Sequence, residues 1–202
     1  MFSISEIFNR TFFARLQAES VMDQCKSICP EIYLRPRQVS ADDHLYFCVR
    51  SFAANGLRHI LQYAFVDDRG NVVLSAFGAT PSPVAVGIVE PPEDLAVEPV
   101  DPEALEYLLT RICSGATMVG FGKVLQAGLL PAETVQAAAS VECAWRRFLR
   151  ISRARHLTFD RDQPWNLSDA MTLAGLRAPE SEDAVMRALA IRDLWSWMDR
   201  VE

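Results

Sequence analysis

Apolar runs separated by turn-forming residues indicate three consecutive β-strands in the first half of the chain. Two compact apolar runs, Leu45–Val49 and Ile60–Val66, have the length and composition of buried strands. The segment Asp67–Asn71, with the sequence DDRGN, separates the second run from a third, Val72–Phe77. Aspartate, glycine and asparagine between apolar runs favour a tight hairpin turn. The pattern therefore predicts strands that pair antiparallel at the start of a sheet.

The second half of the chain has mainly helical periodicity. Apolar residues recur at helical spacing from Leu105 to Ile112, behind Asp101 and Pro102, which are typical of a helix start. A short apolar strand is expected at Ala116–Val119, because a buried strand that follows a helix suits a parallel sheet. The remaining expected elements are helices at 122–130, 142–155, 167–176 and 182–197, and a last strand within Val135–Val141. This order predicts an α/β fold with a mixed five-stranded sheet, three antiparallel strands followed by two parallel ones, flanked by helices.

Residues 1–40 are expected to form a separate N-terminal segment. Apolar side chains recur at helical spacing through residues 3–27, and Ser3 with Glu6 has the form of a capping box. Prolines after this helix favour an extended linker up to about residue 40. The remaining residues, 41–202, are expected to fold as one domain, in which the proline-rich stretch 81–99 forms a loop across one end of the sheet.

Composition places the chain among ordinary globular proteins. Half of its 202 residues are hydrophobic and 23% are charged. No apolar run approaches the roughly 18 residues of a membrane span, and charged residues interrupt the N-terminal apolar pattern where a secretion signal is uninterrupted. The five cysteines are scattered and odd in number, which is typical of free thiols in a reducing compartment. We therefore expect a cytoplasmic protein with no membrane association.

The segment 45–76 resembles the opening of a known enzyme family. Its layout of strand, glycine-containing window, strand, turn and strand is similar to that of the DEDD-type (DnaQ-like) 3′–5′ exonucleases, which have a ribonuclease H-like fold. Further local similarities follow in the family's order at Asn55-Gly56-Leu57, Val86-Gly87-Ile88, Gly115–Gly122 and Glu182–Ala188. The resemblance covers about residues 44–199 and implies a ribonuclease H-like domain.

The residues that carry catalysis in this family are missing from the matching positions. The family holds two divalent metal ions with carboxylates, and a histidine acts as general base. The first two acids of the family match Ser51 and Ala53, the third matches Gln126, the histidine matches Glu182 and the last acid matches Arg187. Hard divalent cations require several oxygen ligands, chiefly carboxylates. The resemblance therefore implies a catalytically inactive, exonuclease-like protein without a metal or other cofactor, which acts as a nucleic-acid-binding or protein-binding regulatory module.

Two alternatives to this interpretation are open at the level of sequence. Relocated acids, Glu182 among them, would make the chain a divergent 3′–5′ exonuclease that binds Mg²⁺ or Mn²⁺. A chain without a nucleic-acid role would be a protein-interaction module. At Arg187, a solvated ion pair with Asp183 is one interpretation. A guanidinium that occupies the position of the metal ions is the other.

A predicted helix around residues 145–155 is a candidate binding surface because it is rich in arginine. Its five arginines are Arg146, Arg147, Arg150, Arg153 and Arg155. One interpretation is a helix whose apolar side packs on the sheet while the arginines face water. The other is a basic surface that binds single-stranded nucleic acid or an acidic protein. The formal net charge of −6 argues against general electrostatic capture of nucleic acid, but it leaves room for a local basic surface.

Two further segments are candidates for protein contacts. Trp195 and Trp197 lie two residues apart on a predicted helix, so both cannot easily face inward. We expect one of them to contact a partner or a second copy in a homodimer. The amphipathic helix at residues 3–27 is the other candidate, because its apolar face must be buried against the domain or a partner.

Overall fold

The structure is a computed structural model, which describes residues 44–54, 57–77, 102–122, 126–157 and 166–202. The expected N-terminal helix at 3–27, the linker up to residue 40, the 81–99 loop and the Asp101 cap lie outside these residues. No helix among the described segments is long and apolar enough to cross a membrane.

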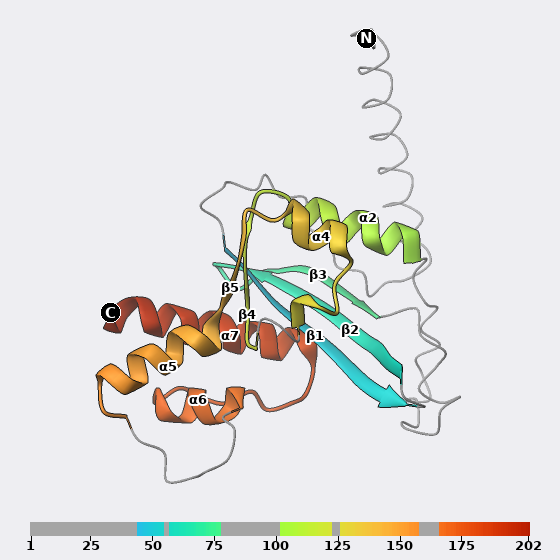
Figure 1. Ribbon diagram of the computed structural model, residues 1–202. Coiled ribbons are helices and arrows are strands. Elements are labelled where there is room, and N and C mark those ends of the chain that lie inside the picture. The colour runs from blue at the N-terminus through green and yellow to red at the C-terminus, as the bar shows by residue number, and fades with distance from the viewer. Residues whose placement is uncertain (1–43, 55–56, 78–101, 123–125, 158–165) are drawn as a thin grey trace, which may run out of the picture.

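Five strands form one mixed sheet at the centre of the molecule (Figure 1). The strands are β1 (His44–Ala54), β2 (Leu57–Asp67), β3 (Val72–Phe77), β4 (Thr117–Gly120) and β5 (Ser140–Cys143). Their order across the sheet is β3-β2-β1-β4-β5. The first three strands pair antiparallel, β4 runs parallel to β1, and β5 runs parallel to β4. This topology confirms the predicted ribonuclease H-like α/β fold.

The turn between β2 and β3 forms where the sequence predicts it. Gly70 has a φ of 79°, a left-handed conformation that glycine adopts without a steric penalty. A carboxylate oxygen of Asp67 accepts hydrogen bonds from the backbone N–H groups of Arg69 at 3.0 Å and Asn71 at 2.8 Å. The hydrogen bonds of the turn are therefore made by residues within the turn, which helps to set the antiparallel register of the hairpin.

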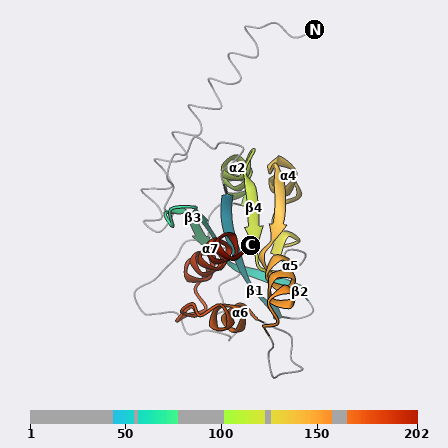
Figure 2. The ribbon, with the colours of Figure 1, turned by 90° about the vertical axis from the view of Figure 1, so that its left-hand side faces the viewer.

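Helices cover both faces of the sheet (Figures 1 and 2). One face packs against α2 (Pro102–Cys113) and α4 (Ala132–Ala137), and the other packs against α5 (Ala144–Ala154), α6 (Leu167–Leu173) and α7 (Ala184–Val201). Successive residues of β1 point to opposite faces of the sheet, as in any strand. They divide the core accordingly, so that Tyr46 and Cys48 pack toward α5, α6 and α7, while Leu45, Phe47 and Val49 pack toward α2.

Strand β4 is short, and its last residue is constrained by a neighbouring ring. Gly120 pairs with Phe47 of β1. A Cβ atom at Gly120 would lie 2.7 Å from the Phe47 ring, closer than carbon atoms approach in folded proteins. Glycine is therefore required at this position, and β1 continues alone on this side beyond the pairing.

The expected last strand at Val135–Val141 is wrong in its position. Its first residues belong to α4, and β5 begins only at Ser140. Thr134 is buried, with its Oγ1 3.2 Å from Oγ1 of Thr110 on α2, so this stretch packs as a helix against another helix. The Ala139 N–H donates to the carbonyl of Ala116 at 2.9 Å, immediately before the pairing of β5 with β4 begins.

The sequence pattern predicts a glycine-containing turn after Val49, but the residues from Arg50 to Ala54 continue β1. Strand β1 remains extended to Ala54 and pairs with β2 throughout. The register shifts between Arg50 and Ser51, which marks a β-bulge or irregularity. The expected boundary at Val49 was too early because the polar residues after it weaken the apolar signal of the strand.

A buried amide of β2 attaches the N-terminus of α7 to the sheet. Gln62 is buried, with only 3% of its surface exposed. Its Oε1 accepts from the backbone N–H of Ala184 at 3.1 Å, and its Nε2 donates to Oδ2 of Asp183 at 3.0 Å. Oδ1 of Asp183 in turn accepts from the N–H groups of Val185 and Met186, which caps the helix.

We predict that Gln62→Leu lowers the free energy of unfolding by about 1–3 kcal/mol, because it leaves the buried N–H of Ala184 without an acceptor. Urea unfolding followed by circular dichroism measures this change. Gln136→Leu is the matched control, since Gln136 is exposed on α4. Equal destabilisation by the two substitutions would contradict the role of the amide.

Candidate functional site

The structure brings together three of the five positions that match the family's catalytic residues, Gln126, Glu182 and Arg187, since Glu182 forms an ion pair with Arg187. Gln126 and Arg187 meet beside Cys48 of β1. Gln126 Nε2 lies 3.9 Å from the Cys48 Sγ, and the Arg187 guanidinium is close enough to the same thiol to lower its pKa. We refer to Cys48, Gln126 and Arg187 as the Cys48 cluster.

Gln126 is held in this place by the unequal lengths of two strands. Pairing of β4 with β1 ends at Phe47 and Gly120, whereas β1 continues. Beyond this point, the backbone N–H of Val49 donates to Oε1 of Gln126 at 3.0 Å. The backbone N–H of Gln126 donates to the carbonyl of Gly122, which fixes the start of the turn that carries it. The glutamine side chain thus takes the place of a missing strand neighbour.

Ser51 and Ala53 lie farther along β1, beyond the irregularity in its register. Ser51 is three residues from Cys48, which is about 10 Å in an extended strand. Within the described segments, the side chain of Ser51 forms no hydrogen bond to another residue. The residue of β1 that faces Gln126 and Arg187 is therefore Cys48, and the next residue on the same strand face is Arg50.

The match of the family's first two acids to Ser51 and Ala53 depends on the register chosen along β1, which stays extended to Ala54. A register that begins at Cys48 puts a thiol and a guanidinium, those of Cys48 and Arg50, at the same two positions. Neither register supplies a carboxylate there.

The electrostatics of the Cys48 cluster are the reverse of those of a metal site. Cys48 is buried, and burial raises the pKa of its thiol, while Arg187, Gln126 and Arg50 act in the opposite direction. The charges that act on the thiol are thus those of two arginines, one of which, Arg187, is also paired with Glu182. A cation in this place would meet electrostatic repulsion.

Arg187 pairs with Glu182 and not with Asp183. Its guanidinium forms an ion pair with the Glu182 carboxylate, whose side chain is 75% exposed. Asp183 is directed at the N-terminus of α7 as its cap. The expected solvated pair of Asp183 with Arg187 is therefore wrong, because the capping geometry holds that carboxylate against backbone N–H groups.

The residues of the Cys48 cluster do not fit a pair of divalent metal ions. Mg²⁺ selects oxygen ligands, and carboxylates neutralise its charge. The cluster instead offers a thiol, an amide and a guanidinium. Throughout the described part of the chain, no group of three or more His, Cys, Asp or Glu side chains is arranged to hold a metal ion.

One arginine of α5, Arg147, lies between α5 and α7 and is largely buried. Arg147 forms an ion pair with Asp199 at 2.7 Å and another with Glu202. Its guanidinium carbon lies 4.4 Å from the centre of the Trp195 ring, which is a cation–π contact. Arg147 is therefore a structural residue that joins α5 to α7.

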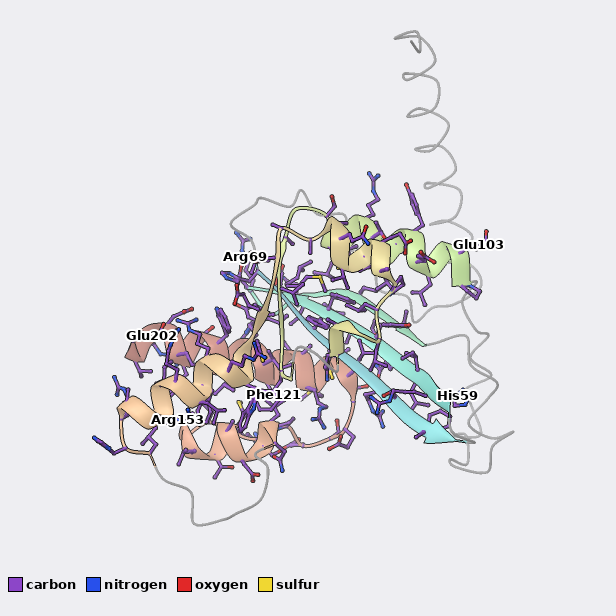
Figure 3. All side chains as sticks on the ribbon, in the orientation of Figure 1. His59, Arg69, Glu103, Phe121, Arg153 and Glu202 are labelled. Carbon is purple, nitrogen blue, oxygen red and sulfur yellow. The ribbon has the colours of Figure 1, made fainter. Side chains whose placement is uncertain are left out.

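Two more arginines of α5 reach the C-terminal end of α7. Arg150 pairs with Glu202 at 2.7 Å, and Arg155 donates to the carbonyl of Val201. Figure 3 labels Arg153 and Glu202 on these two helices. The interpretation in which all five arginines face water is therefore incomplete. Three of them contact the end of α7, about 50 residues away in the sequence, so helical periodicity alone does not reveal these contacts.

An exposed arginine stripe nevertheless remains on α5. Arg146, Arg150 and Arg153 are spaced four and three residues apart, so they lie on the same side of the helix, and all three are exposed. Within the described residues, Arg146 and Arg153 have no carboxylate partner. We refer to these three residues as the α5 stripe.

Both tryptophans of α7 pack onto the body of the domain. Trp195 is 7% exposed, with its ring 5.8 Å from that of His44, and Trp197 lies 6.0 Å from the ring of Phe148. The premise that one of them must face outward is wrong, because α7 packs against the sheet and against α5 on adjacent sides. A partner or a homodimer at this surface stays a prediction.

Comparison with known proteins places this geometry in a structural context. No protein-family model matches the chain, and no curated protein matches it. Among solved structures, it is similar to the catalytic unit of Pan2 from Neurospora crassa, which comprises a protease and a nuclease domain. The TM-score is 0.54 at 11% identity, and the match covers 82% of this chain and 28% of that chain. The chain has an exonuclease-like fold. At this identity the similarity shows the fold alone, so the chemistry rests on the residues described above.

The contacts of Glu202 predict how stability depends on pH. Hydrogen bonds from Arg147 and Arg150 lower the pKa of Glu202 to about 2. A carboxylate with a lowered pKa stabilises the folded state above its usual pKa of 4.5, and this contribution is lost as the pH falls through about 2. We predict that Glu202→Gln reduces the free energy of unfolding at neutral pH and that the difference from the wild type shrinks over this acidic range.

Urea unfolding at a series of pH values measures this difference. Glu103→Gln is the control, because Glu103 lies in the first turn of α2, on the opposite face of the sheet. A Glu202→Gln deficit that stays constant from neutral pH to about pH 2 would contradict the ion-pair explanation.

Proposed function

We propose that the protein is a catalytically silent relative of the 3′–5′ exonucleases that binds single-stranded nucleic acid. The observation that carries the proposal is the convergence of Gln126 and Arg187 on Cys48, in a fold similar to that of a nuclease-containing unit. Hydrolysis by two metal ions needs carboxylates at the position where this chain has a thiol, an amide and guanidinium groups.

The chemistry of the cluster supports binding without cleavage. A guanidinium forms strong, charge-assisted hydrogen bonds with phosphate oxygens, so it can contact a phosphodiester directly where an exonuclease uses a metal ion. Arg187 and Arg50 are the two cations near Cys48. They would neutralise a bound backbone, but neither provides the activated water that hydrolysis requires.

The α5 stripe supplies a second surface suited to a phosphate backbone. Arg146 and Arg153 have no carboxylate partners among the described residues, and Arg150 shares Glu202 with Arg147. Cations in a row along a helix suit a polyanionic chain, whose binding is driven by release of condensed counterions. The stripe therefore favours nucleic acid over an uncharged protein surface as the partner.

The first prediction from this proposal concerns catalysis. End-labelled single-stranded DNA or RNA should keep its length when incubated with the purified protein in Mg²⁺ or Mn²⁺. Gel electrophoresis over a time course measures the length, with Arg187→Asp as a comparison that restores one carboxylate. Shortening that follows the wild-type protein through purification, and that weakens in Glu182→Ala, would favour the divergent exonuclease instead.

The second prediction concerns binding through the α5 stripe. At about 50 mM salt, Arg146→Gln with Arg153→Gln should weaken binding of a single-stranded oligonucleotide and lower the salt dependence by about two phosphate contacts. Fluorescence anisotropy at several salt concentrations measures both quantities. Arg58→Gln with Arg111→Gln is the matched control, because it removes the same charge from exposed positions on β2 and α2. Absence of binding by the wild type would favour a protein-interaction module.

A further inference from the structure

A cationic pocket lies beside the β2–β3 turn, away from the Cys48 cluster. Its volume is about 460 Å³, which is within the usual size range of small-molecule sites. Four arginines from three segments line it, namely Arg69 of the turn, Arg177 of the stretch after α6, and Arg192 and Arg200 of α7. Figure 3 labels Arg69 at this turn, and Arg192 of α7 packs against Gly70 of the same turn.

The acidic residues of this pocket are already engaged in internal contacts. Asp68 accepts from the Tyr46 hydroxyl at 2.8 Å and from the backbone N–H of His44 at 3.2 Å. Asp193 accepts from Nε of its neighbour Arg192 at 3.0 Å. The lining residues alone, four guanidinium groups and two carboxylates, carry a formal charge of two positive units, of which Glu180 beside Arg177 offsets one, in a chain whose formal net charge is −6.

The position of Arg192 depends on the turn. A Cβ atom at Gly70 would lie 1.9 Å from Nη1 of Arg192, so the guanidinium packs against the turn in space that a side chain at position 70 would occupy. The hydrogen bonds to Asp193 hold the other side of the same guanidinium. Contacts on both sides therefore restrict the Arg192 guanidinium, and a restricted side chain loses less entropy on binding.

Two other arginines of the pocket are available to a ligand. Within the described residues, the side chains of Arg69 and Arg200 have no carboxylate partner. The ion-pair partner of Arg177 in the described part of the chain is Glu180, three residues away on the surface. A short-range surface pair of this kind contributes little stability and can be exchanged for a ligand.

We propose that this pocket binds the diphosphate group of a small phosphorylated molecule. Guanidinium groups recognise phosphate oxygens through paired, charge-assisted hydrogen bonds. The arginines surround a pocket and do not follow a line, which suits a compact anion better than the extended backbone of a nucleic acid. The hydroxyl of Ser196, which also lines the pocket, adds a neutral donor.

Titration calorimetry of the full chain with pyrophosphate, in metal-free buffer, tests this proposal. We expect saturable binding at one site, and Arg69→Gln with Arg200→Gln should weaken it at least about tenfold, since two charged contacts are lost. Arg146→Gln with Arg153→Gln is the matched control, because it removes the same charge from α5 and should leave the affinity unchanged. Thermal unfolding provides a second measurement, in which pyrophosphate should raise the Tm of the wild type more than that of the pocket variant.

Three results would overturn the proposal. The first is that pyrophosphate shows no saturable binding. The second is that the two double substitutions weaken pyrophosphate binding equally. The third is that a dodecamer of deoxythymidylate binds in a way that requires Arg69 and Arg200, while pyrophosphate does not bind. Because the α5 variant tests nucleic-acid binding separately, failure here leaves the proposed function intact. Failure of that function likewise leaves the pocket unaffected. ADP is the second probe, since its diphosphate is attached to a nucleoside and shows whether the pocket admits a larger molecule.

Discussion

The buried amide of Gln62 is the contact on which the described architecture depends most. It binds both the cap residue Asp183 and the first N–H of α7, and so determines where the longest helix of the domain leaves the sheet. A buried amide stabilises the fold only when its donors and acceptors have hydrogen-bond partners. In Gln62, both the oxygen and the nitrogen of the amide have such partners. The start of α7 is thus attached to β2 by a single side chain, while the apolar residues along the helix pack on the core.

Helix α7 carries residues of each candidate site. Its first turns bring Arg187 to Cys48, its middle places Arg192 against the hairpin turn, and its last turn gives Glu202 to the arginines of α5. Since these contacts lie along one rigid helix, they are placed relative to one another by the same attachment. The helix therefore carries a residue of the Cys48 cluster, two arginines of the cationic pocket and a partner of the α5 stripe.

Local patterns were sufficient for much of the fold. The hairpin turn could be predicted because Asp67 and Gly70 form it with bonds inside the turn itself. The apolar runs gave the strands, and their order gave the sheet. The stretch after Val135 was assigned to a strand because a short amphipathic helix and a short strand have similar composition, and the burial of Thr134 against α2 decides between them.

The candidate site was less accessible from sequence, since its residues come from distant segments. Gln126 and Arg187 could be found by resemblance, whereas Cys48 needed the true extent of β1. The ion pairs of Arg147 and the burial of Trp195 depend on the crossing of α5 and α7, which no periodicity encodes. The division of the α5 arginines into structural and exposed ones is therefore a tertiary property.

The contact between Gly70 and Arg192 has a consequence for how the sequence can change. The turn needs glycine for its backbone conformation, and the guanidinium needs the same space that a side chain would fill. A side chain at position 70 would require the end of Arg192 to move from the turn, so sequences of this fold that keep the arginine in this place are expected to keep the glycine as well. The two positions, 122 residues apart in the chain, are expected to diverge together as a covarying pair.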